Sequence, residues 1–165
     1  HLYRETSQRD GFLIRRFAYY RDVWARFLKA GLARLLLAYH EGDLLAGVIT
    51  FRFGARAWYM YGASASVKRN LMPNHLLQWE AMLRARAEGV REYDFWGAPD
   101  RLDERDPMWG VYRFKAGFGG RFVERIGAYD FPVGRARYFL YTRLMPRVLE
   151  AMRARHRLRE GAAPR

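Results

Sequence analysis

Residues 73–97 have the sequence PNHLLQWEAMLRARAEGVREYDFWG, and this stretch decides the fold. Proline is favoured in the first turn of a helix, where no backbone N–H donor is needed. One apolar stripe at helical spacing follows it, formed by Leu76, Trp79, Leu83 and Ala87. Gly89 is a typical helix stop, and apolar and aromatic residues are frequent in the segment after it. The sequence therefore predicts a helix over 73–88 that leads directly into a strand over 91–96.

The segments before this helix have the pattern of antiparallel strands. Apolar runs at 33–40 and 44–53 are joined by the sequence EGD at 41–43, which is typical of a β-hairpin. A third strand is predicted over 57–62. Because the strand at 91–96 follows a helix, it is expected to pair in parallel through a crossover connection. We therefore predict an α/β (α+β) fold with a mixed, mainly antiparallel sheet flanked by helices.

Helices are also predicted towards both ends of the chain. Residues 6–31 have helical periodicity, with Gly11 as a break between two helices. Residues 136–159 are predicted to form a helix in which Pro146 causes a kink or break. Its apolar stripe has steps of four and consists of Leu140, Leu144, Val148 and Met152. A frayed tail is expected over 161–165.

A short helix is predicted over 111–116, and a strand or hairpin over 121–131 with a bulge at Gly127. Two helices, a β-meander, a crossover helix, a strand, a short helix and a last strand form the element order of the acetyltransferase-like fold known as GNAT. We accordingly assign residues 1–135 to a GNAT-like domain. Residues 136–165 are assigned to a basic helix and tail that packs on this domain or extends from it.

Composition limits the kinds of site that the chain can hold. Its 165 residues, half of them hydrophobic, are enough for the core of one domain. It has no cysteine and only four scattered histidines, so neither a disulfide framework nor a metal site is predicted. No apolar run approaches the roughly 20 residues that cross a bilayer, and the first residues lack a signal-peptide layout. We expect a cytoplasmic protein, with peripheral contact at the inner membrane face as a further option.

The net charge of +13 and a pI near 10.6 predict attraction to polyanions, because neutralised phosphates release counterions. A genome rich in G and C would also enrich arginine, and composition leaves both explanations open. The predicted C-terminal helix could lie along a tRNA acceptor stem, rest on anionic lipid, or face solvent. Its basic residues are Arg135, Arg137, Arg143, Arg147, Arg153, Arg155, Arg157 and Arg159.

The loop before the crossover helix argues against coenzyme A. A GNAT acetyltransferase binds pyrophosphate there with a glycine-rich loop, whose backbone N–H groups point at the phosphates. The corresponding residues 68–74 (KRNLMPN) contain no glycine, and Pro73 removes one donor. No cofactor is expected. Lys68 and Arg69 are candidates for contacting a substrate phosphate through their side chains, and a solvated basic loop is an equal alternative.

The most specific signal is the segment YDFWG at 93–97, followed by YRFKAGFGG at 112–120 and the sequence ERIGAYD at 124–130. It resembles the Fem-type (FemABX) peptidyltransferases, which build the interpeptide bridges of peptidoglycan from aminoacyl-tRNA. The likeness extends upstream to 6–12, 59–64 and 76–80, and covers the chain up to about residue 132.

This resemblance implies an aminoacyltransferase of cell-wall synthesis that takes an amino acid from aminoacyl-tRNA. The acceptor would be an amine of a UDP-linked or lipid-linked muramyl pentapeptide. Fem-type enzymes contain two GNAT-like domains, and this chain is similar to the second. A first GNAT-like domain of the same protein is therefore an expected partner.

Lys115 is the candidate catalytic residue. Aminolysis of an ester passes through an oxyanion, which a fixed cation stabilises. In a helix Val111, Phe114 and Phe118 share one face, which would anchor Lys115 beside the core; the family likeness points to the same pair, Phe114 and Lys115. Asp94 is the candidate acceptor for a proton of the attacking amine. A surface lysine next to a core phenylalanine is the alternative.

Three tyrosines are candidates for binding substrate. Tyr59 and Tyr61 are two apart in a strand and are therefore predicted to share a face, where they could donate hydrogen bonds or stack on a terminal adenosine. Tyr112 lies in the motif that precedes Lys115. Ordinary sheet packing is the alternative for the strand pair.

Two other functions stay open at this point. One is a coenzyme A dependent N-acyltransferase that acts on another amine. The other is a basic module that docks on RNA or membrane without catalysis. Binding of acetyl-CoA would indicate the N-acyltransferase. A docking module would be indifferent to Phe114→Ala beyond any loss of stability.

Overall fold

The computed structural model describes residues 1–161, except the side chains of residue 153 and of residues 156–161. It divides the chain into two compact units, of which the first is His1–Phe122 and the second begins at Val123. Each unit is considered by itself. The predicted domains, 1–135 and 136–165, stay a prediction.

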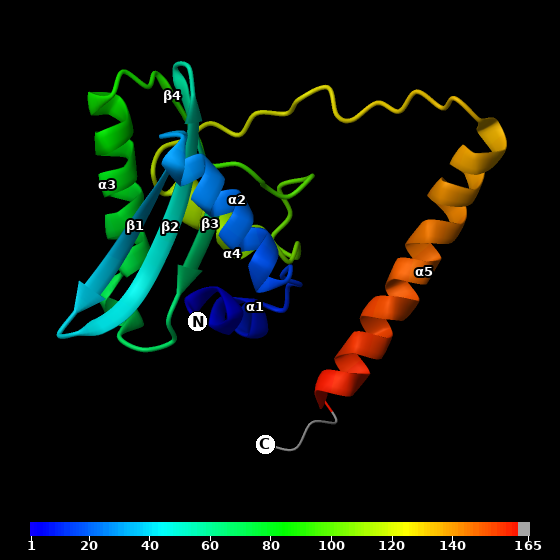
Figure 1. Ribbon diagram of the computed structural model, residues 1–165, viewed down its shortest axis with the longest axis horizontal. Coiled ribbons are helices and arrows are strands. Elements are labelled where there is room, and N and C mark those ends of the chain that lie inside the picture. Colours follow the sequence, from blue (N-terminus) through cyan, green and yellow to red (C-terminus); the bar gives the residue numbers. More distant parts are fainter. Residues whose placement is uncertain (162–165) are drawn as a thin grey trace. The chain divides into compact units, whose positions relative to one another are not determined.

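The first unit is built on a four-stranded sheet with the order β1-β2-β3-β4. β1 (Ala33–His40), β2 (Asp43–Phe53) and β3 (Arg56–Ser64) pair antiparallel, whereas β4 (Glu92–Asp94) pairs parallel with β3. The helix α3 (Pro73–Ala87) connects β3 with β4 (Figure 1). The predicted mixed sheet and its parallel crossover are therefore confirmed.

β1 forms one edge of this sheet. Its hairpin with β2 closes at Glu41 and Gly42, which both have positive φ, 50° and 85°, as a two-residue turn requires. The alternate side chains Leu35, Leu37 and Tyr39 of β1 are exposed. This edge strand therefore has one row of apolar side chains in contact with solvent.

Two helices lie on one face of the sheet, as predicted from the break at Gly11. α1 (Leu2–Asp10) ends at Gly11, which has φ 72° and donates its N–H to the Ser7 carbonyl. α2 (Phe17–Lys29) follows after a short connection. α1 begins four residues before the predicted helix, because its first turn has no side-chain cap that marks its start in the sequence.

α3 covers the opposite face (Figure 1). Pro73 occupies its first turn, as predicted. Leu77 packs against Ala38, Ala46 and Val48 of the sheet, and these residues form the buried core. Burial of this apolar surface is what holds the helix against the strands.

A β-bulge interrupts the pairing of β2 with β3. Ile49 faces Tyr61 and Thr50 faces Tyr59, so Met60 is left without an opposite residue. The extra residue turns Tyr59 and Tyr61 to opposite faces of the sheet. Tyr61 packs on Tyr20 of α2 at 5.8 Å between ring centroids, whereas Tyr59 packs against the core under α3. The prediction that the two tyrosines share a face is therefore wrong.

The chain after β4 differs from the prediction in one element. α4 (Trp109–Ala116) contains the predicted short helix, and β4 itself is shorter than the predicted 91–96. Residues 121–131, all of them described, form no strand. Phe122 is half-buried, but the other apolar side chains are exposed, including Ile126 at 86% and Phe131 at 91%. The apolar spacing of this segment suggested a strand, but a strand also needs a neighbour that covers it.

The second unit contains the helix α5 (Arg135–Gly161). The helix continues through Pro146, so of the predicted kink or break the break does not occur, and the kink stays a prediction. Its apolar stripe is exposed and consists of Leu140, Leu144, Val148 and Met152. Residues 162–165 of the predicted tail, and the side chains of Arg153, Arg157 and Arg159, lie outside the described residues.

Candidate active site

The candidate site lies where β3 and β4 separate. Their parallel pairing covers three residue pairs and ends at Trp58 and Asp94. β3 continues to Ser64, whereas β4 stops, and the chain turns away at Trp96. A crevice beyond the carboxyl ends of parallel strands is the usual place for a ligand in an α/β sheet. The end of the β3–β4 pairing, at Trp58 and Asp94, is therefore the expected place for a ligand.

Lys115 is at this separation point. Its ammonium donates a hydrogen bond to the Gly97 carbonyl, three residues beyond the end of β4. It also lies 5.8 Å from the centroid of the Tyr59 ring, close enough for a cation–π contact. Burial lowers the pKa of Lys115 from its ordinary value, and the negative charge of Asp94 partly opposes this effect. The ammonium is thus held in the protein rather than extended into bulk solvent.

Asp94 shapes the turn that carries the Gly97 carbonyl. Its Oδ1 accepts the backbone N–H of Trp96 at 2.8 Å. Trp96 has φ 63°, a left-handed conformation that is uncommon for a residue with a bulky side chain. The carboxylate therefore supports a strained turn and also acts on Lys115 electrostatically. The structure brings together two of the predicted catalytic residues, Asp94 and Lys115.

Phe114 fastens α4 to α3. Its ring contacts His75 at 4.9 Å and Phe118 at 5.4 Å, and Phe118 stacks on Phe95 at 5.4 Å. This cluster fixes the helix from which Lys115 extends. Val111, predicted to share the buried face, is 44% exposed, so this part of the prediction is wrong. The first turn of α4 is less covered than its last turn.

Tyr59 is the candidate substrate-binding residue that lies beside Lys115. Burial raises the pKa of its hydroxyl. Its ring also contacts Phe95, at 6.5 Å between centroids. A Cβ on Gly62 would overlap the Tyr59 hydroxyl, so the phenol lies directly over the bare backbone of that glycine. The bulge at Met60 is the feature that turns this tyrosine towards the site.

Two residues of this site were not predicted from the sequence. Gln78 of α3 is completely buried and accepts a hydrogen bond from the Tyr93 hydroxyl at 2.9 Å. His75, one turn earlier, lies between Phe114 and Phe118. The apolar pattern gave no signal for Gln78, because Leu76, Trp79 and Leu83 of the predicted stripe are exposed. The buried face of α3 is formed by Leu77, Gln78 and Ala81.

The other two candidate tyrosines are held in different places. Tyr61 contacts Trp24 at 5.5 Å within the aromatic cluster under α1 and α2. Tyr112 contacts Trp109 at 5.2 Å and Phe122 at 6.0 Å. Of the three, Tyr59 is the one whose ring lies beside the Lys115 ammonium. A substrate-binding role for Tyr61 and Tyr112 stays a prediction.

Lys68 is paired with two carboxylates of the first hairpin. Its Nζ lies 2.7 Å from Glu41 and 3.0 Å from Asp43, and hydrogen bonds to them raise the pKa of the lysine. Arg69 follows in a single 3-10 turn, Arg69–Leu71. A phosphate contact by Lys68 would have to compete with these carboxylates. The role of both residues in binding substrate stays a prediction.

α1 is joined to the end of β3 by polar contacts. Thr6 Oγ1 accepts the Ser64 N–H at 2.9 Å, and Arg9 donates to the Ser64 carbonyl at 3.0 Å and to its hydroxyl at 3.1 Å. These residues belong to sequence segments about sixty positions apart that the resemblance had grouped. They fix the end of the strand that borders the site.

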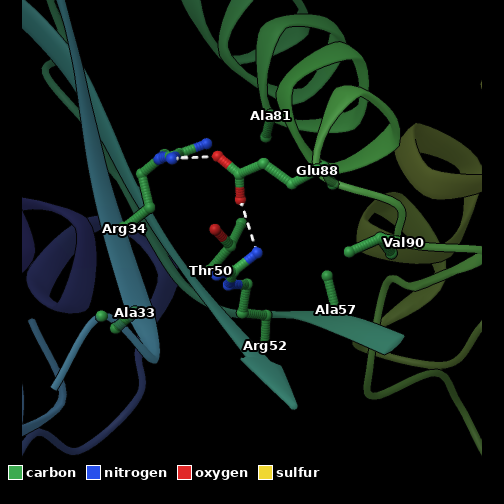
Figure 2. Close-up of a pocket in the computed structure, with 10 residues that line it drawn as sticks. Ala33, Arg34, Thr50, Arg52, Ala57, Ala81, Glu88 and Val90 are labelled. Atoms are coloured by element: carbon green, nitrogen blue, oxygen red, sulfur yellow. Dashed lines mark hydrogen bonds and ion pairs between the residues drawn. The ribbon is translucent and has the colours of Figure 1, made fainter. Parts of the chain in front are cut away.

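A separate cavity of about 250 Å³ lies between α3 and the first three strands. Its walls are mostly small side chains, among them Ala57, Ala81 and Ala85. At its rim, Glu88 accepts hydrogen bonds from Arg34 and, at 3.0 Å, from Arg52 (Figure 2). The carboxylate thus joins the end of α3 to β1 and β2, and the arrangement indicates a structural ion-pair cluster.

The described residues contain no group of three or more acidic or histidine side chains placed to hold a metal ion. Among the helices within residues 1–161, none has both the length and the apolar character of a membrane span.

Comparison with known families completes the description. The model of the FemAB family matches residues 34–145, more than half of the chain. This chain belongs to the FemAB family. The match includes Lys115 and both strands that separate beside it, and it confirms the resemblance found in the sequence.

Curated relatives of this FemAB chain carry the name lipid II:glycine glycyltransferase. The protein of Staphylococcus epidermidis is 34% identical over 124 residues, which make up 75% of this chain and 30% of that protein. The protein of Staphylococcus haemolyticus is 32% identical over 135 residues, 79% of this chain and 32% of that protein. The FemAB chain thus spans about a third of the length of these relatives.

Solved structures confirm the GNAT-like fold. FemX matches with a TM-score of 0.75 and 23% identity over 84% of this chain and 51% of FemX. A probable acetyltransferase matches with a TM-score of 0.55 and 18% identity, over 81% of this chain and 88% of its own. At these identities the likeness concerns the fold alone.

Proposed function

We propose that this FemAB chain is part of an aminoacyltransferase that adds an amino acid to a peptide amine of a peptidoglycan precursor. The observation that carries the proposal is the Lys115 ammonium, held on the Gly97 carbonyl where β3 and β4 separate. Membership of the family and the name of its relatives, lipid II:glycine glycyltransferase, support it.

The proposed reaction needs a fixed positive charge. The acceptor amine attacks the ester carbonyl of the aminoacyl donor, the carbonyl oxygen becomes an oxyanion, and the ester bond then breaks to release the donor hydroxyl. A cation positioned at that oxygen stabilises charge that exists only in the transition state. The Phe114 and Phe118 cluster holds α4 in place, so Lys115 needs little reorganisation.

A carboxylate near the cation can take the proton that the attacking amine releases. Asp94 acts on Lys115 electrostatically and lies on the strand that leads to Gly97. We assign it this role, and Tyr59 the role of binding substrate. Phe114 is a positioning residue for Lys115.

The donor in this proposal is aminoacyl-tRNA, and the acceptor is a UDP-linked or lipid-linked muramyl pentapeptide. The excess of basic residues suits both a polyanionic donor and an acceptor at an anionic membrane surface. We place the reaction in the cytoplasm, with peripheral contact at the inner membrane face. A first GNAT-like domain of the same protein would complete the acceptor site.

Coenzyme A has no part in this proposal. In the loop between β3 and α3 the N–H groups of Leu71 and Met72 already donate to the carbonyls of Lys68 and Arg69, and Pro73 has no N–H. A pyrophosphate cradle of backbone N–H groups is poorly served by such a loop. The loop supports a donor other than a coenzyme A thioester, and we take charged tRNA as that donor.

The direct test is a transfer assay with the chain, and with the longer protein that contains it. Charged tRNA pools and muramyl pentapeptide precursors are supplied, and transfer of labelled amino acid to the peptide is measured. We expect transfer that is lost in Lys115→Met and kept in Lys29→Met, an exposed lysine of α2. Calorimetry with acetyl-CoA is expected to show no binding. Transfer that survives Lys115→Met would rule out the proposed catalyst, and acetyl-CoA binding would favour an N-acyltransferase.

A further inference from the structure

Gln78 lies on the buried face of α3, in contact with the Tyr93 hydroxyl. Its side chain is completely buried, and its Oε1 accepts the Tyr93 hydroxyl at 2.9 Å. Its Nε2 is also buried and has no hydrogen-bond partner among the described residues. A buried amide donor that stays unsatisfied is expensive, so it is expected to have a partner in the working protein.

Tyr59 lies on the same side of the sheet as Gln78, because it packs against the core cluster that contains Leu77. Both Tyr59 and Tyr93 contact the ring of Phe95. The Gln78 side chain acts on the Tyr59 phenol in the direction that lowers its pKa, although burial has the larger, opposite effect. A group that donates a hydrogen bond to the phenol oxygen has this effect, because it favours the phenolate and so lowers the pKa. The phenol has little freedom to leave, because its hydroxyl lies over Gly62 and its ring contacts Phe95.

The orientation of the Gln78 side-chain amide decides whether its free end donates or accepts a hydrogen bond. Because the Tyr93 hydroxyl donates to Oε1, the opposite end of the amide is the NH2 group, which can only donate. A phenol oxygen that accepts from this group keeps its own proton for another acceptor. Tyr59 would then keep its O–H for a second acceptor, and the Lys115 ammonium lies over the face of the same ring, 5.8 Å from the centroid.

We propose that Gln78 is a positioning residue that fixes Tyr59 as a hydrogen-bond donor to the reacting oxygen of the substrate. The inference rests on the proposed function for the identity of that oxygen. Lys115 and Tyr59 then supply two donors to one developing negative charge, one charged and one neutral. Gln78 touches no substrate and acts through the orientation of the Tyr59 hydroxyl.

The first experiment is a double-mutant cycle in the transfer assay. Tyr59→Phe is expected to lower kcat by about a hundred- to a thousandfold with little change in KM, as for loss of one oxyanion donor. Gln78→Met, close in size and apolar, is expected to lower kcat by no more than Tyr59→Phe does. In the Tyr59→Phe background it is expected to cause no further loss. Equal kcat for Gln78→Met and wild type, or losses that multiply in the double variant, would overturn the inference.

Gln78→Glu adds a signature that a purely structural role would not produce. A protonated carboxyl keeps the same polarity as the amide, with one acceptor and one donor, whereas a carboxylate accepts from both tyrosines. We expect near wild-type kcat at low pH and a fall as the new carboxyl ionises. The matched control is Glu80→Gln, on the same helix and partly exposed, with no such step. A pH profile of Gln78→Glu that matches wild type after NMR shows the carboxyl to have ionised would contradict the inference.

A second measurement needs no activity. In the nuclear Overhauser spectrum of the labelled chain, the Gln78 side-chain amide protons are expected to be closer to the Tyr59 ring than to the Tyr93 ring. The reverse order would overturn the inference whatever the transfer assay gives. If wild type shows no transfer but the amide protons face Tyr59, the proposed function fails and the orientation by Gln78 stands.

Discussion

The Lys115 ammonium donates a hydrogen bond to the backbone carbonyl of Gly97, the residue that follows the left-handed Trp96. The turn that leaves β4 therefore supplies the acceptor for the one candidate cation of the site. Because burial already disfavours the charged ammonium, a substrate oxyanion at this position would meet a cation with little competing water.

Lys115→Met is expected to reduce transfer by about a hundred- to a thousandfold, the usual effect of losing an oxyanion stabiliser. Stability should be nearly unchanged, because the substitution removes a charge that burial disfavours. Transfer rates and urea unfolding of the same preparations measure both effects. Lys29→Met, at an exposed position, serves as the control for general loss of a lysine.

The lowered pKa of Lys115 predicts a pH dependence of stability. Between the pKa in the folded protein and the ordinary value of 10.5, the unfolded chain binds a proton that the folded chain does not. The free energy of unfolding of wild type relative to Lys115→Met should therefore rise with pH through this window. Below the window the difference should be constant. A difference that falls with rising pH would show that the lysine is stabilised in its charged form.

Asp94→Asn is expected to lower the pKa of Lys115 further, because the carboxylate is the group that raises it. The chain has three lysines, Lys29, Lys68 and Lys115, so NMR of 13C-methylated lysines resolves each of them. The Lys115 signal should titrate at lower pH in the variant than in wild type. An unchanged Lys115 titration would contradict the electrostatic link to Asp94.

Gly62→Ala is expected to destabilise the fold by about 1–3 kcal/mol, the usual range for overpacking. The added Cβ would overlap the Tyr59 hydroxyl and come within 2.7 Å of its Cζ. In a Tyr59→Ala background the same substitution should have a much smaller effect. Urea unfolding of the four proteins in this cycle measures the coupling, and additive effects would show that the phenol can move aside.

Glu88→Gln is expected to reduce stability by up to about 1 kcal/mol, since the ion pairs with Arg34 and Arg52 are partly exposed. The loss should shrink in high salt, which screens such pairs. Glu80→Gln, which removes one contact to Arg84 at 3.5 Å, is the matched control and should change stability less. Unfolding at two salt concentrations separates the two variants.

The order of elements was predictable because local signals mark it. Gly11, Gly42 and Gly89 lie at the positive-φ positions that end helices or close turns, and Pro73 lies in the first turn of α3. Each of these residues restricts or permits backbone angles regardless of the rest of the chain. The predicted strand at 121–131 lacks this kind of support. Its apolar residues depend on a covering neighbour, which a local pattern does not reveal.

The site was predictable in part for the same reason. Lys115 and Asp94 belong to recognisable motifs, and the structure brings them together. The placement of Tyr59 depends on the bulge at Met60, because one extra residue reverses the faces of the strand beyond it. The position of the Gln78 side chain depends on its hydrogen bond with Tyr93, a residue fifteen positions away in the sequence. Pairings of this kind arise from packing and leave no signal in the apolar pattern of the helix.

The outer side of β1 has a practical consequence. An end strand with an apolar row of Leu35, Leu37 and Tyr39 offers backbone donors and acceptors to any second extended chain. Preparations of this polypeptide should therefore tend to aggregate by strand addition as concentration rises. A lysine in place of Leu37 is the natural choice for keeping it monodisperse during crystallisation or NMR.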